Sequence, residues 1–326
     1  MDSNIPEFTN VKRYRLSERK SKVDVSKTGT PYSPGGSFND FLNTLPDILA
    51  AGDFKSAVNA IVKARNKGAP VVLAMGAHPI KVGLCPIIIN LINEGLITAI
   101  ATNGASVVHD FELSYMGYTS EDVLEHLNDG SFGMAYETGV FLNEAINSGV
   151  EEGYGIGYSI GKYINSEPSM KFAEKNSIFA ACFRKQIPMT VHVAIGTDII
   201  HMHPEADGAK IGLGSMRDFK IFTGVVSGLN HGVFINLGSA VLIPEVFLKA
   251  LTLARNTGAC VDNFTAVNMD FIRHYRAHEN VLKRPTANGG KAISLIGHHE
   301  LMFPLLAAAV LEKMTTQPLR IIKEEF

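Results

Sequence analysis

Short continuous runs of apolar residues alternate with segments of helical periodicity along most of the chain. The runs typical of strands buried on both faces cover residues 70–75, 97–101, 187–195, 232–237, 263–268 and 292–296. Between them, apolar residues at three- and four-residue spacing predict helices, at residues 38–49, 54–64, 86–94, 216–229, 244–257 and 301–314. Strands and helices that alternate in this way form right-handed crossovers. The predicted fold class is therefore α/β, with a mostly parallel sheet and helices on both faces.

The two ends of the chain lack this pattern. Residues 1–37 are polar and basic and finish in a turn-rich segment, which predicts an N-terminal arm that is either solvated or wrapped around another subunit. No linker-like composition interrupts residues 38–316, which we expect to form one domain. Residues 317–326 are expected to be a C-terminal tail. Within the domain, Ser215 is the predicted N-cap of the helix at 216–229.

The composition limits the classes of protein to which this chain can belong. With 46% hydrophobic residues and a formal net charge of −2, the chain can bury a large core and offers no electrostatic case for binding nucleic acid or an anionic membrane. No segment approaches 18 consecutive apolar residues, and no signal peptide is evident. Cys85, Cys182 and Cys260 stand in apolar surroundings, so we expect buried thiols without a disulfide. These features favour a soluble cytoplasmic protein.

Glycine-containing loops follow the first, second and fourth predicted strands, at residues 76–83, 102–110 and 238–240. In a parallel sheet, ligands bind beyond the carboxyl ends of the strands, so these loops are candidate binding sites. The glycine run at 153–161 resembles a dinucleotide fingerprint only superficially, because no strand precedes it and no acidic residue follows about twenty residues later at a strand end. It is expected to begin a helix instead.

Several histidines fall near the third predicted strand. If the segment is extended, His201 and His203 lie on one face, and His192 precedes them. Together with His298 or His299 they would suit zinc, but no fourth ligand is fixed by spacing. Polar side chains that line a pocket are the favoured interpretation, and we assign no metal ion.

Lys291 lies between two glycines and the apolar run at 292–296. The local sequence fits a surface lysine in a glycine turn. It also fits a buried lysine, whose lowered pKa would leave a neutral amine able to form an imine with a carbonyl carbon.

The end of the chain resembles deoxyhypusine synthase, in Gly290-Lys291 followed by LMFPLL at 301–306. The resemblance extends in order over about residues 38–315, through the loop at 102–110, Ile187-Pro188, Thr197-Asp198 and the loop at 237–240. It implies a Rossmann-like, doubly wound sheet and a homotetramer with NAD at its subunit interfaces. It also implies that Lys291 is the imine-forming residue.

The resemblance assigns roles to particular residues. NAD is expected to contact nine of them, namely Gly76, Thr102, Asn103, Gly104, Ala105, Asp198, Gly238, Ser239 and His298. Lys291, His109 and His201 are the expected catalytic residues.

This sequence differs from that family at positions that contact the substrate. Gly289 and Pro285 stand where the family has a tryptophan and a glutamate that contact spermidine, and His109 replaces a glutamate. A dication needs carboxylates to offset its desolvation. We therefore expect an NAD-dependent transferase that oxidises an amine other than spermidine, or an amino acid whose carboxylate is met by His109, His201 or Lys81. The alternative is a NAD- or metal-binding protein of this fold without transferase activity.

Overall fold

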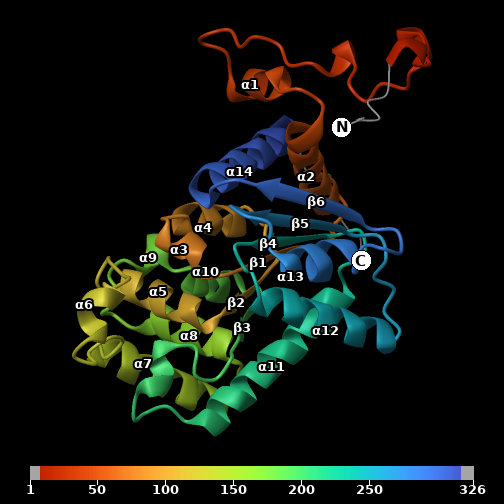
Figure 1. Cartoon of the computed structure of the whole chain (residues 1–326). Coiled ribbons are helices and arrows are strands. Elements are labelled where there is room, and N and C mark those ends of the chain that lie inside the picture. Colours follow the sequence, from red (N-terminus) through yellow and green to blue (C-terminus); the bar gives the residue numbers. More distant parts are fainter. Residues whose placement is uncertain (1–7, 317–326) are drawn as a thin grey trace, which may run out of the picture. The chain divides into compact units, whose positions relative to one another are not determined.

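The computed structural model describes residues 8–316 (Figure 1), and the chain divides into two compact units, Met1–Gly52 and Asp53–Phe326. The first unit holds 3-10 turns and one helix, η1 (Phe8–Asn10), η2 (Leu16–Glu18), η3 (Val25–Lys27) and α1 (Phe38–Thr44). Ser37 and Asp40 cap α1 reciprocally, each accepting a hydrogen bond from the other's backbone N–H. The predicted tail at 317–326 and the first seven residues of the predicted arm lie outside the described residues.

The second unit contains a six-stranded sheet in which every neighbouring pair is parallel. Its strands are β1 (Val71–Met75), β2 (Ala99–Asn103), β3 (Met189–His192), β4 (Val233–Leu237), β5 (Thr265–Asp270) and β6 (Lys291–Ile296). The order β3-β2-β1-β4-β5-β6 reverses direction between β1 and β4, which is the switch point of a doubly wound fold. The predicted fold class is confirmed.

Helices connect and cover the strands (Figure 1). They are α2 (Leu49–Asn66), α3 (His78–Lys81), α4 (Cys85–Asn93), α5 (Gly104–Tyr115), α6 (Val123–Leu127), α7 (Tyr136–Glu151), α8 (Ile156–Ser166), α9 (Ala173–Asn176), α10 (Ile178–Lys185), η4 (Ile199–Met202), α11 (Gly208–Ser227), α12 (Leu242–Asn256), α13 (Tyr275–Ala277), the π-helical turn η5 (His278–Lys283) and α14 (His299–Thr316). Within residues 8–316 no helix combines the length and apolar character needed to cross a membrane.

Alternate strand residues pack on opposite faces of the sheet, which explains why the strands are apolar throughout. On one face Phe234 of β4 stacks on Phe247 of α12, with ring centroids 3.7 Å apart, in a core shared with α11 and η5. On the other face Leu73 of β1 meets side chains of α2, α4 and α14, among them Phe303. Both faces are therefore buried.

The start of α11 differs from the prediction. The helix begins at Gly208, and Asp207 caps it by accepting hydrogen bonds from the backbone of Ala209 and Lys210. Ser215 lies inside the helix, where its hydroxyl bonds the backbone of β3 and the residue after it. The predicted cap at Ser215 is wrong because a tertiary hydrogen bond uses that hydroxyl, and the Asp-Gly pair eight residues earlier is the true start.

The three cysteines are free. Cys85 and Cys182 are buried, as predicted, but Cys260 is exposed. That part of the prediction is wrong because Cys260 lies in the loop between α12 and β5, where apolar neighbours in sequence do not cover it.

Two buried aspartates tie helices to neighbouring elements. Asp110 of α5 accepts hydrogen bonds from the Ser177 hydroxyl at 2.5 Å and from the backbone N–H of Ile178 at 2.7 Å, at the start of α10. Asp218 of α11 accepts from the backbone N–H groups of Gly157 and Val191, each at 2.9 Å. Burial raises the pKa of each carboxyl group to about 7. Both carboxyl groups therefore have a structural role, in which they hold these elements together.

Candidate functional site

The carboxyl ends of the six parallel strands form one edge of the sheet, called here the carboxyl edge. All nine predicted cofactor residues lie at this edge, in strand β2 or in the segments that follow β1, β2, β3, β4 and β6. Lys291 is the first residue of β6 and lies at the opposite, amino edge. The fold therefore places the predicted cofactor residues at the carboxyl edge of the sheet and the predicted imine-forming lysine at the amino edge.

Two glycine loops meet at the switch point. The N–H of Gly76 donates to the carbonyl of Leu237 at 3.2 Å, and a Cβ on Gly76 would lie 2.7 Å from the carbonyl oxygen of Gly238. Gly238 has φ +65°, and a Cβ there would lie 2.5 Å from a ring carbon of His299. Neither position tolerates a side chain without moving a neighbour. These glycines keep the ends of β1 and β4 close together where a doubly wound fold binds its ligand.

His299 is buried beside this junction with free ring nitrogens. Its side chain is 1% exposed, and neither nitrogen has a hydrogen-bond partner among the described residues. The ring lies against His78 and Phe271, with centroids 5.2 and 5.7 Å away, and its Nε2 is 3.8 Å from a carboxylate oxygen of Asp270. Burial lowers the pKa of His299, with Asp270 acting in the opposite direction. A buried imidazole without partners is costly unless a ligand satisfies it.

The predicted cofactor residue His298 is exposed next to that ring. It stacks on Phe271 at 6.4 Å, with the ring planes 13° apart. The sequence prediction missed Asp270 and Phe271 because it ended β5 at residue 268. An aspartate two residues after the predicted end of the strand, at the carboxyl edge, was the signal that could have found them.

His109 of α5 is held by a short chain of hydroxyl and carboxyl groups. Its Nδ1 is 2.7 Å from the hydroxyl oxygen of Thr119, and that hydroxyl donates to Glu112. Thr119 must then accept from His109, so the proton is on Nδ1 and Nε2 keeps its lone pair. Thr138 donates to the other oxygen of Glu112 at 3.0 Å. Burial, with a smaller contribution from the charge of Lys81, lowers the pKa of His109 to about 4, so the ring is neutral at pH 7.

A cavity of about 230 Å³ opens beside His109. One cation and three carboxyl groups line it, together with apolar side chains, and these charged residues are Lys81, Glu112, Glu121 and Asp198. Glu121 accepts the N–H of Gly133 at 2.8 Å. Among the described residues the Nε2 of His109 has no hydrogen-bond partner. The cavity thus combines a free acceptor nitrogen with groups of both charges.

Asp198, which lines this cavity, lies next to His201, which does not. His201 accepts the N–H of Gly196 at Nδ1, at 3.1 Å, and its Nε2 is 3.9 Å from Asp198. Burial raises the pKa of Asp198, with His201 acting in the opposite direction. Only 6% of the His201 side chain is exposed, so this residue positions Asp198 and does not face the cavity.

The start of α5 is organised mainly by structural bonds. Thr102 donates to the carbonyl of Met75 at 2.9 Å, and Asn103 caps the helix through Ser106. A Cβ on Gly104 would lie 2.0 Å from a carboxylate oxygen of Asp198. The hydroxyl of Thr102 and the Oδ1 of Asn103 are therefore occupied, whereas the NH₂ group of Asn103 has no partner among the described residues.

Lys291 is not buried. Its side chain is exposed and lines a different cavity, which lies at the amino edge. At about 3.3 Å per residue, its Cα is about 16 Å from Ile296 at the other end of β6. Of the two interpretations of Lys291, the surface lysine is confirmed and the buried lysine is wrong, because β6 is an edge strand of the sheet and its first residue pairs only with β5. The imine role of Lys291 stays a prediction.

The histidines considered for zinc do not converge. His192 is 3.1 Å from the hydroxyl of Thr190, whereas His203 is bonded to the carbonyl of Gly133 at 2.9 Å. The segment with His201 is a 3-10 turn, not the extended chain that the prediction assumed. Between residues 8 and 316, no three His, Cys, Asp or Glu side chains are grouped so as to hold a metal ion.

Comparisons with known proteins support the fold. No family model matches the chain, and no curated protein matches it by sequence. Solved structures do match. AgrE, in a ternary complex with ornithine and NAD+, matches with TM-score 0.53 and 18% identity over 84% of this chain, which spans 35% of AgrE. A candidate deoxyhypusine synthase from Entamoeba histolytica matches with TM-score 0.55 and 13% identity over 87% of this chain and 96% of its own. A conserved candidate LOR/SDH protein from Methanococcus maripaludis S2 matches with TM-score 0.50 and 16% identity, over 90% of this chain and 75% of its own.

Proposed function

We propose that the protein is a NAD-dependent enzyme that oxidises an amine or amino acid at the carboxyl edge. The observation that carries this proposal is His109, a neutral imidazole with a free Nε2 in a charged cavity beside the start of α5. A group in this state can accept a proton from a substrate. The cavity lies at the carboxyl edge of a doubly wound sheet, where such folds bind nucleotides.

The residues at this edge fit a dinucleotide. Gly76 and Gly238 would let the cofactor backbone approach the strand ends closely. Buried polar atoms without partners flank them, and these are Oδ1 of Asn236, Oδ2 of Asp198 and both ring nitrogens of His299. Strand β2 ends in Asn103, without the acidic residue that binds ribose in many dinucleotide-binding folds. The nearby carboxyl group at this edge is that of Asp198.

Oxidation of an amine removes a hydride from carbon and a proton from nitrogen. NAD, when bound, supplies the hydride acceptor. His109 would take the proton at Nε2, and its Nδ1–H bond to Thr119 would hold the ring in that orientation. Lys81 would meet a substrate carboxylate, while Glu121 and Asp198 would face a substrate ammonium group. This charge pattern favours an amino acid over a simple polyamine, and the ornithine held by AgrE agrees with that class.

Transfer of the oxidised fragment through Lys291 is a further part of the proposal. Because Lys291 lies at the amino edge of its own subunit, capture would require a second subunit that brings its carboxyl edge to this lysine. The proposed homotetramer would provide such a contact. Borohydride trapping of the imine, followed by peptide mass analysis, tests this step. A trapped adduct in the wild type and none in Lys291→Arg would support transfer through this lysine. If neither protein gives an adduct, transfer through Lys291 is rejected.

The oxidation is tested by mixing the protein with NAD and a panel of amino acids and polyamines while the absorbance of reduced nicotinamide is recorded. We expect turnover with amino acids that carry a second amine. Calorimetry with NAD alone separates this function from the alternative, a NAD-binding protein without catalysis. Binding without turnover of any substrate would favour the alternative, and absence of binding at millimolar NAD would reject both.

A further inference from the structure

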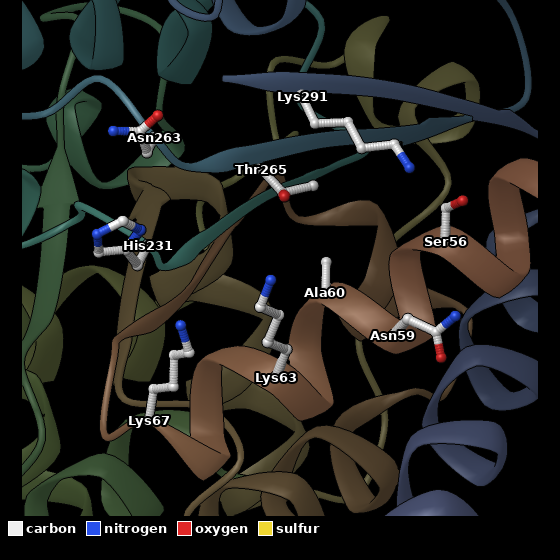
Figure 2. Close-up of a pocket in the computed structure, with 9 residues that line it drawn as sticks. All are labelled: Ser56, Asn59, Ala60, Lys63, Lys67, His231, Asn263, Thr265 and Lys291. Atoms are coloured by element: carbon white, nitrogen blue, oxygen red, sulfur yellow. The ribbon is translucent and has the colours of Figure 1, made fainter. Parts of the chain in front are cut away.

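A second cavity, of about 320 Å³, lies at the amino edge of the sheet and is lined by basic side chains (Figure 2). Lys63 and Lys67 extend from the end of α2 toward the strands, and Lys291 extends from β6 toward α2. His231, Asn263 and Thr265 complete the side formed by the strands. No residue that lines the cavity carries a carboxyl group.

The fold places these residues together for identifiable reasons. Lys63 is in the last turn of α2 and Lys67 follows the helix directly, four residues later, so both extend toward the strands from this end of the helix (Figure 2). His231 has φ +62°, and its N–H donates to the carbonyl of Asn263 at 2.8 Å, which ties the entrances of β4 and β5 together. Lys291 pairs with Thr265 at the first position of the β5–β6 ladder. The cavity thus has a defined backbone frame.

The three lysines have no protein counterion. Within residues 8–316 none of their amino groups forms an ion pair or a hydrogen bond, whereas Lys162 pairs with Glu152 elsewhere on the surface. The neighbouring Asn59 uses its side-chain oxygen to accept from Lys313, which leaves its NH₂ group as a donor. Like charges four residues apart on a helix destabilise it. A cluster of cations and donors without an anion is an arrangement that an anionic ligand would complete.

We propose that this cavity binds a small phosphate-bearing anion. Lysine ammonium groups bind phosphate as point charges, and three of them in a lining without a carboxyl group suit an anion that carries more than one negative charge. The volume is at the lower end of the range for small-molecule sites. In this role Lys291 acts as a charged binding group, which differs from the neutral nucleophile that imine formation requires. Within one subunit the cavity lies at the opposite edge of the sheet from the proposed NAD site, and anion binding is an alternative to imine transfer through Lys291.

The test is calorimetry of the full chain at low salt with pyrophosphate and, separately, with ADP. We expect Lys67→Ala and Lys291→Ala each to weaken binding about ten-fold, as for one lost charged hydrogen bond. Lys291→Arg should stay within about three-fold of the wild type because it keeps the charge. Lys220→Ala removes an exposed lysine of α11 that does not line the cavity and should leave binding unchanged. Circular dichroism of each variant confirms folding.

Binding of ADP that is tighter than that of pyrophosphate would identify a nucleotide, and equal binding a free phosphate compound. Either result supports the site. Saturation with NAD should leave pyrophosphate binding unchanged, and competition would overturn the assignment to a separate site. Absence of pyrophosphate and ADP binding, or equal affinity in the wild type and all lysine variants, would overturn the proposal.

Discussion

The two edges of the sheet differ in how their ionisable groups are placed. At the carboxyl edge His109 and His299 are withdrawn from water, and burial lowers their pKa values. At the amino edge Lys63, Lys67 and Lys291 are exposed and unpaired. The carboxyl edge is thus suited to proton transfer, and the amino edge to charge recognition. One strand supplies both environments, since β6 has Lys291 at one end and leads to His298 and His299 at the other.

The largest expected effect tests the carboxyl edge. If His109 accepts the substrate proton, His109→Gln should lower turnover about 10²–10⁴-fold, which is the usual range for a general base. Binding of NAD, measured by calorimetry, should change little. His126→Gln is the matched control, because this histidine lies in α6 and, within residues 8–316, its ring bonds only the exposed Ser131. Equal turnover in the wild type and His109→Gln would remove the basis of the proposed chemistry.

A second prediction concerns the glycine junction. Gly238→Ala places a methyl group 2.5 Å from His299 at φ +65°, whereas Gly68→Ala has a similar φ of +69° with no atom within 4 Å. Both should lose about 1 kcal/mol from backbone strain, and Gly238→Ala a further 1–3 kcal/mol or so from overpacking. Urea unfolding of both variants measures the difference. If both variants lose the same free energy of unfolding, His299 does not pack tightly against Gly238 and the prediction is wrong.

The pH dependence of stability gives a third test. The folded-state pKa of His109 is about 4, below its unfolded value of 6.5, so the folded protein binds fewer protons in that window. The stability that the neutral ring of His109 contributes is therefore complete above pH 6.5, and it is lost as the pH falls toward 4. Between pH 7 and pH 4.5, His109→Gln should lose less unfolding free energy than the wild type, by about 1–2 kcal/mol after allowance for partial solvent exposure. Parallel pH curves for the two proteins would contradict the lowered pKa.

The smallest effect is expected at the amino edge. Without ligand, Lys67→Ala should leave the free energy of unfolding unchanged or raise it by up to about 0.5 kcal/mol, because it removes a like-charge neighbour of Lys63. Lys249→Ala is the control, since Lys249 pairs with Glu245 and its loss should cost about 0.3–0.5 kcal/mol. Thermal or urea unfolding at low salt measures both. A clear loss in Lys67→Ala would show that this lysine has a structural partner and would weaken the proposal of an anion site.

Much of the fold was determined by the sequence alone. The six predicted strands all formed, since segments that are mainly apolar are covered on both faces inside a parallel sheet. Glycines and polar residues after those runs then had to lie at one edge, because parallel strands all end on the same side. For this reason the predicted cofactor residues were found together, although they are spread from Gly76 to His298.

Only the tertiary structure decided which side chains face each other across elements. The Nδ1 proton of His109 depends on Thr119 and Glu112, and the partnerless ring of His299 depends on Asp270, Phe271 and the turn at Gly238. No periodicity specifies such contacts between distant segments. Lys291 is the clearest case: a resemblance in sequence placed it in the catalytic site, but its position at the first residue of an edge strand puts about 16 Å between its Cα and the carboxyl end of β6. Sequence order identifies the strand, and the direction of that strand in the folded sheet decides which edge each end reaches.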